Sequence, residues 1–189
     1  MRKLLTTMIL AALLVTAGCG GVGTTSFVHP EFDFAFLESV AVVPFENISD
    51  DQGAGHQATR YFDNSLLAAE AFNIVEPGEV ARVLENEGLI RTAQLADAQI
   101  VAIGAELGVQ GLFLGSVSES SSLRSGSTTV SVVTVVIRLV ETETGATVWS
   151  ATASEDSATL WSSLFGTGQK SRSDVMRRAI DECLDTLLD

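Results

Sequence analysis

The chain contains only two histidines, which are the first residues to consider for metal or acid–base chemistry. His29 and His56 lie far apart in the sequence, and neither has a cysteine or a pair of carboxylates at the short spacings typical of metal ligands. We therefore expect surface or structural roles for both histidines. No metal and no other cofactor is expected.

Three short stretches resemble catalytic or phosphate-binding motifs, but each lacks a required feature. Gly-Ala-Gly-His at 53–56 lies between an expected strand and an expected helix, yet it lacks the lysine and the full glycine spacing of a phosphate loop. Gly-Ser-Val at 115–117 lacks the second glycine of a nucleophile elbow. Asp50 and Asp51 suit a helix cap better than an acid–base pair. We therefore expect a protein that is not an enzyme.

Cys19 carries the clearest chemical signal, because of the residues before it. Two basic residues and an apolar run over 4–15 form a secretory leader, which is shorter than the about 20 residues of a spanning helix. The small pair Ala-Gly before the cysteine resembles a bacterial lipobox, in which the cysteine sulfur receives a diacylglyceryl group. We predict a signal peptide over 1–18 and lipidation of Cys19. The alternative is an ordinary signal peptide in which Cys19 is incidental.

Residues 19–38 are predicted to be the lipidated N-terminus and a tether, because they mix glycine, threonine and serine. Part of the phenylalanine-rich end of this stretch is expected to pack on the domain as an extended segment. Glycines rather than an aspartate follow Cys19, which by resemblance to enterobacterial sorting rules favours the outer membrane. The predicted location is therefore the outer membrane, with the domain in the periplasm.

The charge of the mature chain excludes one class of partner. Removing the leader leaves 9 basic and 24 acidic residues, a net charge of −15. Such a chain repels phosphate backbones and anionic lipids, so no nucleic-acid binding is expected. Membrane attachment would then come from the lipid on Cys19.

Cys183 has no partner within the chain once Cys19 is lipidated. It could pair with another chain in an oxidising compartment. The spacing favours a different interpretation, because Cys183 lies at helical intervals from Val175, Ala179, Leu184 and Leu187. We therefore expect a small core residue.

The organising stretch of the sequence is Ser-Val-Ala-Val-Val-Pro-Phe at 39–45, whose nearly unbroken apolar run predicts a strand buried on both faces. Further strands are expected over 73–76, 111–117, 128–141 and 146–154, helices over 53–70, 79–87, 95–107 and 173–188, and a polar loop over 118–127. The predicted order is β-α-β-α-α-β-β-β-α. This order indicates one small α/β domain over 39–189, with a mixed sheet flanked by helices.

The strand expected over 128–141 is apolar on both faces in its middle. One face carries Val130, Val132 and Val136, and the other carries Val133, Val135, Ile137 and Leu139. We expect a central strand covered by helices on one side and by the chain or a neighbour on the other.

Four stretches together resemble a known family. They are Val-Ala-Val-Val-Pro-Phe-Glu-Asn at 40–47, Ser-Leu-Leu-Ala-Ala-Glu-Ala-Phe-Asn-Ile-Val-Glu at 65–76, Glu-Leu-Gly-Val-Gln-Gly-Leu-Phe-Leu-Gly-Ser-Val at 106–117, and Ile-Arg-Leu-Val-Glu-Thr-Glu-Thr-Gly-Ala-Thr-Val-Trp-Ser at 137–150. In this order they resemble the curli secretion lipoprotein (CsgG) family and the related LpoB-type lipoproteins that activate penicillin-binding proteins.

The resemblance implies a domain with a shape related to anticodon-binding domains, on the periplasmic side of the outer membrane. Pro77 stands where many relatives have arginine. Two functions follow: a lipid-anchored interaction or assembly factor that binds an envelope protein or its own copies, and an oligomeric secretion-channel subunit of the curli type. We favour the first, because the loops over 118–127 and 158–170 are short for membrane-crossing hairpins.

The predicted partner-binding residues are Trp161, Leu164 and Phe165, in an aromatic-rich segment between the final hairpin and the final helix. Tryptophan is among the residues most enriched at interface hot spots. The alternative is that Trp161 and Phe165 fold back and cap the sheet, since exposed aromatic pairs are costly on a lone domain.

Overall fold

Strand β2 (Ser39–Val42) lies inside a mixed sheet whose strand order is β1-β7-β6-β5-β2-β4, with β3 also paired to β5. The computed structural model describes residues 24–89, 91–125, 128–157 and 170–188. The other strands are β1 (Thr25–Val28), β3 (Glu46–Asn47), β4 (Asn73–Ile74), β5 (Gly111–Ser125), β6 (Thr128–Glu141) and β7 (Thr147–Asp156). The helices are η2 (Phe34–Phe36), α2 (Ala54–Ala69), α3 (Pro77–Asn86), α4 (Asp97–Leu107) and α6 (Arg172–Leu188).

β2 is buried on both faces, as its apolar run predicts. It pairs in parallel with both β4 and β5. Val40 and Val42 pack in the core beneath α2, whereas Ala41 and Val43 pack in a second core beneath α3 and α4. The strand ends before Pro44, which has no N–H to donate to the ladder.

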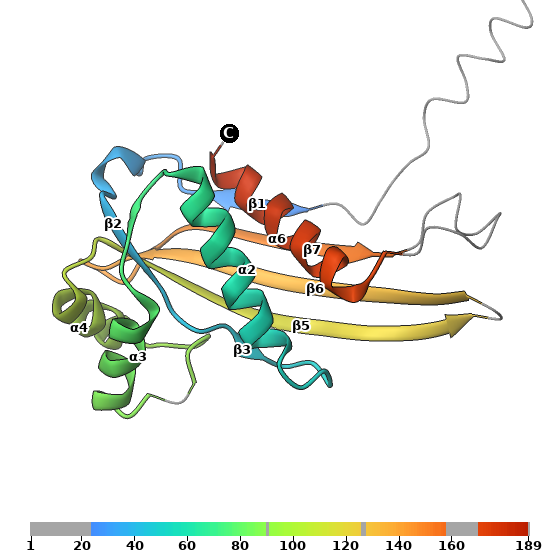
Figure 1. The fold of residues 1–189 in the computed structure, drawn as a ribbon. Helices are drawn as coiled ribbons and strands as arrows, with labels where there is room; N and C mark the ends of the chain where they lie inside the picture. Colours follow the sequence, from blue (N-terminus) through green and yellow to red (C-terminus); the bar gives the residue numbers. More distant parts are fainter. Residues whose placement is uncertain (1–23, 90, 126–127, 158–169, 189) are drawn as a thin grey trace, which may run out of the picture.

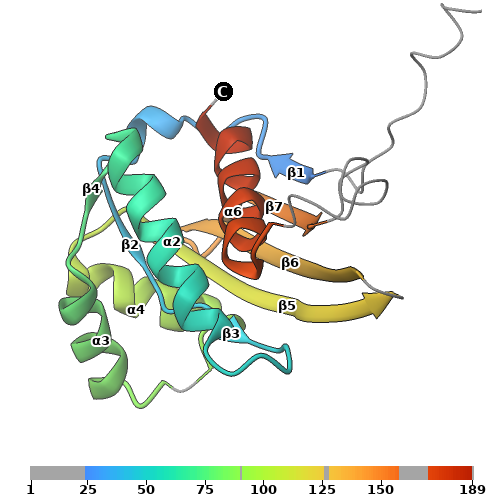
Figure 2. The ribbon, with the colours of Figure 1, turned by 45° about the vertical axis from the view of Figure 1, so that its right-hand side comes forward.

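The two helical layers cover different areas of the sheet. α2 and α6 lie across one face and reach β5, β6 and β7 (Figures 1 and 2). α3 and α4 lie on the opposite face and pack mainly against β2 and β5. Edge-to-face contacts link Phe62 of α2, Phe113 of β5 and Trp149 of β7 through the core under α2 and α6. From Ser39 onward the elements follow the predicted order, with the short β3 added.

The predicted polar loop over 118–127 is wrong, because β5 continues to Ser125. Its distal part pairs with β6 after a bulge between Val117 and Glu119. Serine has low strand propensity, but the Val- and Thr-rich partner strand supplies the pairing that overrides it. The Ser122 and Ser131 hydroxyls lie 3.2 Å apart across the two strands. The β5–β6 hairpin therefore extends past the helices (Figure 1).

β6 has one covered face and one open face in its middle. Val133, Val135, Ile137 and Leu139 are fully buried under the helices, as predicted. The opposite face is not fully covered by the chain itself, because Val136 is 37% exposed. The reason is the position of α3 and α4, which lie over β2 and the start of β5 instead. Cover by a neighbour stays a prediction.

The predicted tether contains a strand. β1 pairs antiparallel with β7, in agreement with the expectation that part of residues 19–38 packs on the domain as an extended segment. α3 begins at Pro77, two residues earlier than predicted, because proline suits the first turn of a helix. Among the described residues, no helix is both long and apolar enough to cross a membrane.

Cys183 is a core residue, as its spacing predicts. Its side chain is fully buried on the inner face of α6. Burial raises the pKa of the thiol to about 12. The thiol therefore stays protonated and unreactive at neutral pH.

Changing Val135 to Asp should lower the free energy of unfolding by about 3 kcal/mol or more, because an unpaired carboxylate would enter the dry core. Val136→Asp is the matched control, since its side chain points to the open face of the same strand. Urea denaturation of both variants measures the difference. Equal losses of stability in the two variants would show that the two faces of β6 do not differ in burial.

Candidate partner-binding surface

The predicted partner-binding residues lie outside the described part of the chain. Trp161, Leu164 and Phe165 fall within residues 158–169, and Cys19 falls within residues 1–23. Their roles remain predictions. The structure does describe the two places where the segment 158–169 joins the domain, and these places lie next to each other.

The segment leaves the sheet at Ser157 and rejoins the domain at the start of α6. The Ser157 hydroxyl accepts a hydrogen bond of 2.8 Å from the Ser131 N–H, and the Ser157 N–H donates to the Ser131 carbonyl at 2.9 Å. Arg172, the first residue of α6, donates to the Ser122 hydroxyl at 2.8 Å. Because Ser122 and Ser131 are cross-strand partners, Ser157 and Arg172, which flank the segment, are bonded to one place on the hairpin.

A polar junction, formed by Asp51, Ser120, Ser122 and Arg172, joins three separate parts of the chain. The Arg172 guanidinium lies 2.9 Å from the Asp51 carboxylate. The Ser120 hydroxyl donates to the same carboxylate at 2.7 Å. The turn after β3, the hairpin and the start of α6 are thereby held in a fixed relation.

Hydrogen bonding controls the charge of the junction. The Ser120 hydroxyl lowers the pKa of Asp51 below its usual value; burial opposes this shift, and the Arg172 guanidinium supports it. Asp51 is therefore ionised at neutral pH. It does not perform the predicted role of a helix cap, because Gly53 is the N-cap of α2 and provides no side-chain cap.

The start of α6 is fixed by a local cap that the sequence pattern already contains. The Ser171 hydroxyl accepts from the Asp174 N–H at 3.2 Å, and the Asp174 carboxylate accepts from the Ser171 N–H at 3.2 Å. This reciprocal pair is a capping box. The Ser-x-x-Asp spacing at 171–174 was the signal by which sequence reasoning could have found this helix start.

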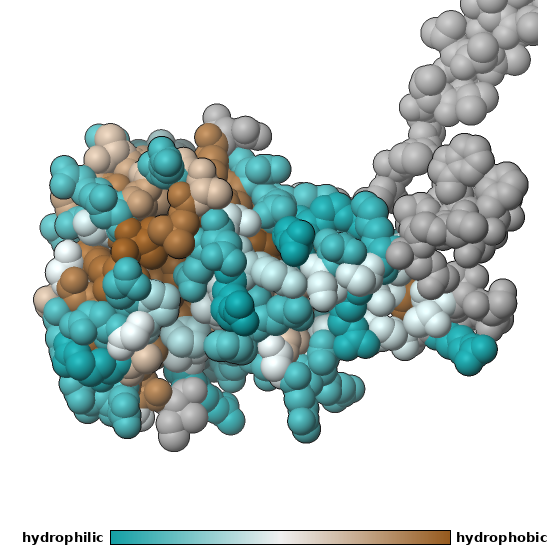
Figure 3. All heavy atoms as spheres, in the orientation of Figure 1, coloured by the Kyte–Doolittle hydropathy of each residue, from teal (hydrophilic) through white to brown (hydrophobic). Residues whose placement is uncertain are grey.

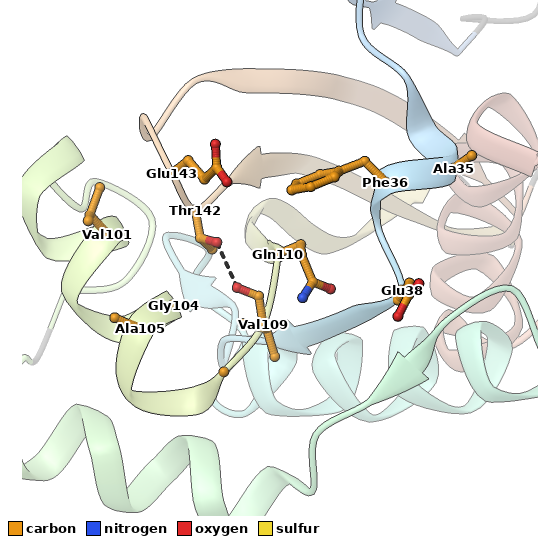
Figure 4. A pocket seen from close by; sticks show the side chains of 11 residues that line it. Ala35, Phe36, Glu38, Val101, Gly104, Ala105, Val109, Gln110, Thr142 and Glu143 are labelled. Carbon is orange, nitrogen blue, oxygen red and sulfur yellow. Dashed lines mark hydrogen bonds between the residues drawn. The ribbon is translucent and has the colours of Figure 1, made fainter.

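A second feature of the surface is an open pocket of about 700 Å³ at the other end of the sheet. Figure 4 shows the Phe36 ring reaching across it, with Val101 and Ala105 of α4 on the opposite wall. The Thr142 hydroxyl donates to the Val109 carbonyl at 2.6 Å (Figure 4), and the Gln110 side chain accepts from the Ser39 N–H. These polar groups therefore serve the fold.

The described surface contains no group suited to metal catalysis. No cluster of three or more histidine, cysteine, aspartate or glutamate side chains at metal-binding distance occurs among the described residues. Figure 3 shows apolar side chains gathered beside α2, whereas the surface of the hairpin is mainly hydrophilic. Leu67 of α2 is 58% exposed.

The comparison with protein families decides between the two predicted relatives. The family described as peptidoglycan-synthase activator LpoB matches residues 36–154, from η2 through nearly all of β7. The chain belongs to the LpoB family. The activator side of the predicted resemblance is confirmed, and the curli-secretion side is not supported.

Solved structures agree with this LpoB-family fold. The chain resembles PelC from Paraburkholderia phytofirmans, solved as a dodecamer, with 23% identity, a TM-score of 0.60 and coverage of 87% of this chain and 96% of that chain. Lipoprotein GNA1162 from Neisseria meningitidis shares 18% identity, with a TM-score of 0.57 and coverage of 79% and 97%. At these identities the likeness shows the fold alone. No curated protein matches the chain significantly.

Changing Asp51 to Asn should lower the free energy of unfolding by about 1 kcal/mol at pH 7, because the partly exposed carboxylate loses its charge-assisted bonds. The folded-state pKa of Asp51 is depressed, so this stabilisation is present above the unfolded pKa of about 3.9 and is lost as the pH falls through the lower folded value.

Denaturation at pH 7 and near pH 3 measures the difference between wild type and Asp51→Asn, which should shrink at the acidic pH. The exposed neighbour provides the control Asp50→Asn. A difference that is the same at both pH values, or equal losses for the two variants, would contradict the assigned role of Asp51.

Proposed function

We propose that this protein is a lipid-anchored, non-enzymatic factor of the cell envelope that binds and activates a peptidoglycan synthase. The match of residues 36–154 to the synthase-activator family carries this proposal. The matched range includes β2 and the whole β5–β6 hairpin, whereas the segment 158–169 and α6 follow it in the sequence.

The partner surface that we propose is the segment 158–169, with Trp161, Leu164 and Phe165 as its anchors. The polar junction supports this choice, because the Asp51–Arg172 ion pair fixes the start of α6, which follows the segment in the sequence. A fixed end lowers the entropy lost when aromatic anchors bind a partner. Self-association through the same segment is the competing possibility.

Changing both Trp161 and Phe165 to Ser tests this surface. The variant should melt like wild type and bind the purified peptidoglycan synthase of the same envelope about tenfold more weakly or worse, because two hot-spot side chains are lost. Surface plasmon resonance measures the affinity, and a glycan polymerisation assay measures the activation.

Leu67→Ser is the control for removal of an exposed apolar side chain elsewhere. A variant that unfolds would instead place Trp161 and Phe165 in the core. A wild-type chain that neither binds nor activates any synthase would overturn the proposed function itself. Analytical ultracentrifugation of the wild type and of the double variant measures their oligomeric states. It thereby separates loss of synthase binding from loss of self-association.

Lipid attachment at Cys19 with sorting to the outer membrane completes the proposal. The basic start, the short apolar run and the small residues before Cys19 support it. Cys19→Ser should leave an uncleaved precursor that incorporates no labelled palmitate, since the acyl acceptor is gone. Equal incorporation by wild type and variant would contradict the prediction, and Cys183→Ser is the matched control because that thiol is buried.

A further inference from the structure

β1 is the outermost strand of the sheet, and no strand of the described part of the chain pairs with its outer edge. All four of its residues are exposed, including Phe27 at 45% and Val28 at 48%. Edge strands usually carry charges, prolines or bulges that prevent another strand from pairing with them. β1 contains no charged residue and no proline, and its register with β7 is unbroken.

The hydrogen-bond pattern shows which backbone groups face outward. The His29 N–H donates to the Val148 carbonyl at 2.8 Å, and Phe27 is the cross-strand partner of Ser150. Because hydrogen-bonded and non-bonded pairs alternate in an antiparallel ladder, Phe27 and His29 direct their N–H and C=O groups toward β7. Ser26 and Val28 direct theirs toward the open edge, and no described strand pairs with them there.

The edge is held in position before any partner arrives. The Thr24 hydroxyl donates to the Glu182 carboxylate at 2.8 Å and ties the start of β1 to α6. The Phe27 and His29 rings meet edge to face at a centroid distance of 6.4 Å. The indole N–H of Trp149, the cross-strand partner of Val28, donates to Thr186 of α6 at 3.1 Å. A fixed edge reduces the ordering cost of adding a strand.

Charge determines what kind of strand fits. α6 runs beside β1 and carries Glu182 and the exposed Asp185, while the nearby Arg178 is engaged by Glu155 at 3.0 Å. The mature chain has a net charge of −15. Two copies meeting at this edge would bring their α6 carboxylates together, which is unfavourable, whereas a basic segment would be attracted.

We propose that the outer edge of β1 accepts an extended, basic segment of the partner protein as an added strand. The Ser26 and Val28 backbone groups form the new ladder, Phe27 and Val28 contact apolar side chains on the two faces of the added strand, and the α6 acids attract its lysine or arginine residues. That the partner is a synthase rests on the proposed function. That the edge accepts a basic strand rests only on the backbone and charges described above.

Photo-crosslinking in the native envelope tests this surface with the full-length chain. A photoreactive amino acid placed at Ser26 should form a crosslink to a segment of another protein that mass spectrometry shows to be rich in lysine or arginine. The crosslink yield should fall about tenfold in Val28→Pro, which removes an outward N–H. Val28→Thr, which keeps that N–H, is the matched control and should retain the crosslink.

Val28→Pro should melt close to wild type, because the Val28 N–H does not bond β7, whereas Phe27→Pro should destabilise the strand by removing a ladder bond. A basic crosslinked segment that belongs to a protein other than a synthase would support the edge proposal and show that the edge binds a different partner from the proposed synthase. A crosslink only to a second copy, to an acidic segment, or one equally strong in Val28→Pro would overturn the edge proposal.

Discussion

The burial of β2 on both faces is the constraint on which the rest of the structure depends. Val40 and Val42 need one apolar layer, and Ala41 and Val43 need another on the opposite side. Parallel pairing with β4 and β5 then requires crossover connections, which α2 supplies on one face and α3 with α4 on the other. The positions of all later elements follow from this three-layer centre.

The second layer ends before the sheet does, and this gives the domain two different halves. Near β2, and at Val140 at the end of β6, the sheet is covered on both sides, whereas the middle of β6 around Val136 is exposed on the side away from α6. Serine and threonine side chains on the open face are suited to contact with water, whereas the exposed apolar side chains of Val136 and Phe27 are not. The edge of β1 that we propose for partner binding lies at this end of the sheet order, beyond β6 and β7.

Local patterns predicted the parts of the fold that local chemistry determines. Continuous apolar residues identified β2, and helical spacing identified α2, α4 and the buried Cys183. The distal part of β5 was missed because serine residues read as a loop when the pairing partner is not known. The sequence also did not show where the second helical layer ends over β6, because valine on both faces gives no sign of that boundary.

The site was less predictable than the fold, because its contacts join residues far apart in the sequence. Asp51, Ser120 and Arg172 meet only through tertiary structure, and no spacing rule links them. The outward direction of the Ser26 and Val28 backbone likewise depends on which register β1 takes against β7. In contrast, the Ser171–Asp174 cap is a local signal that was readable in advance.

The position of β1 near the predicted lipidation site limits the distance between the domain and the membrane. If the lipid is on Cys19, only the residues before Thr25 lie between the anchor and the sheet, and an extended chain spans about 3.5 Å per residue. The near edge of the domain would then stay within about 20 Å of the membrane leaflet that holds the lipid. The encounter with a synthase would therefore be made by the partner, whose own reach decides where in the envelope the two proteins meet.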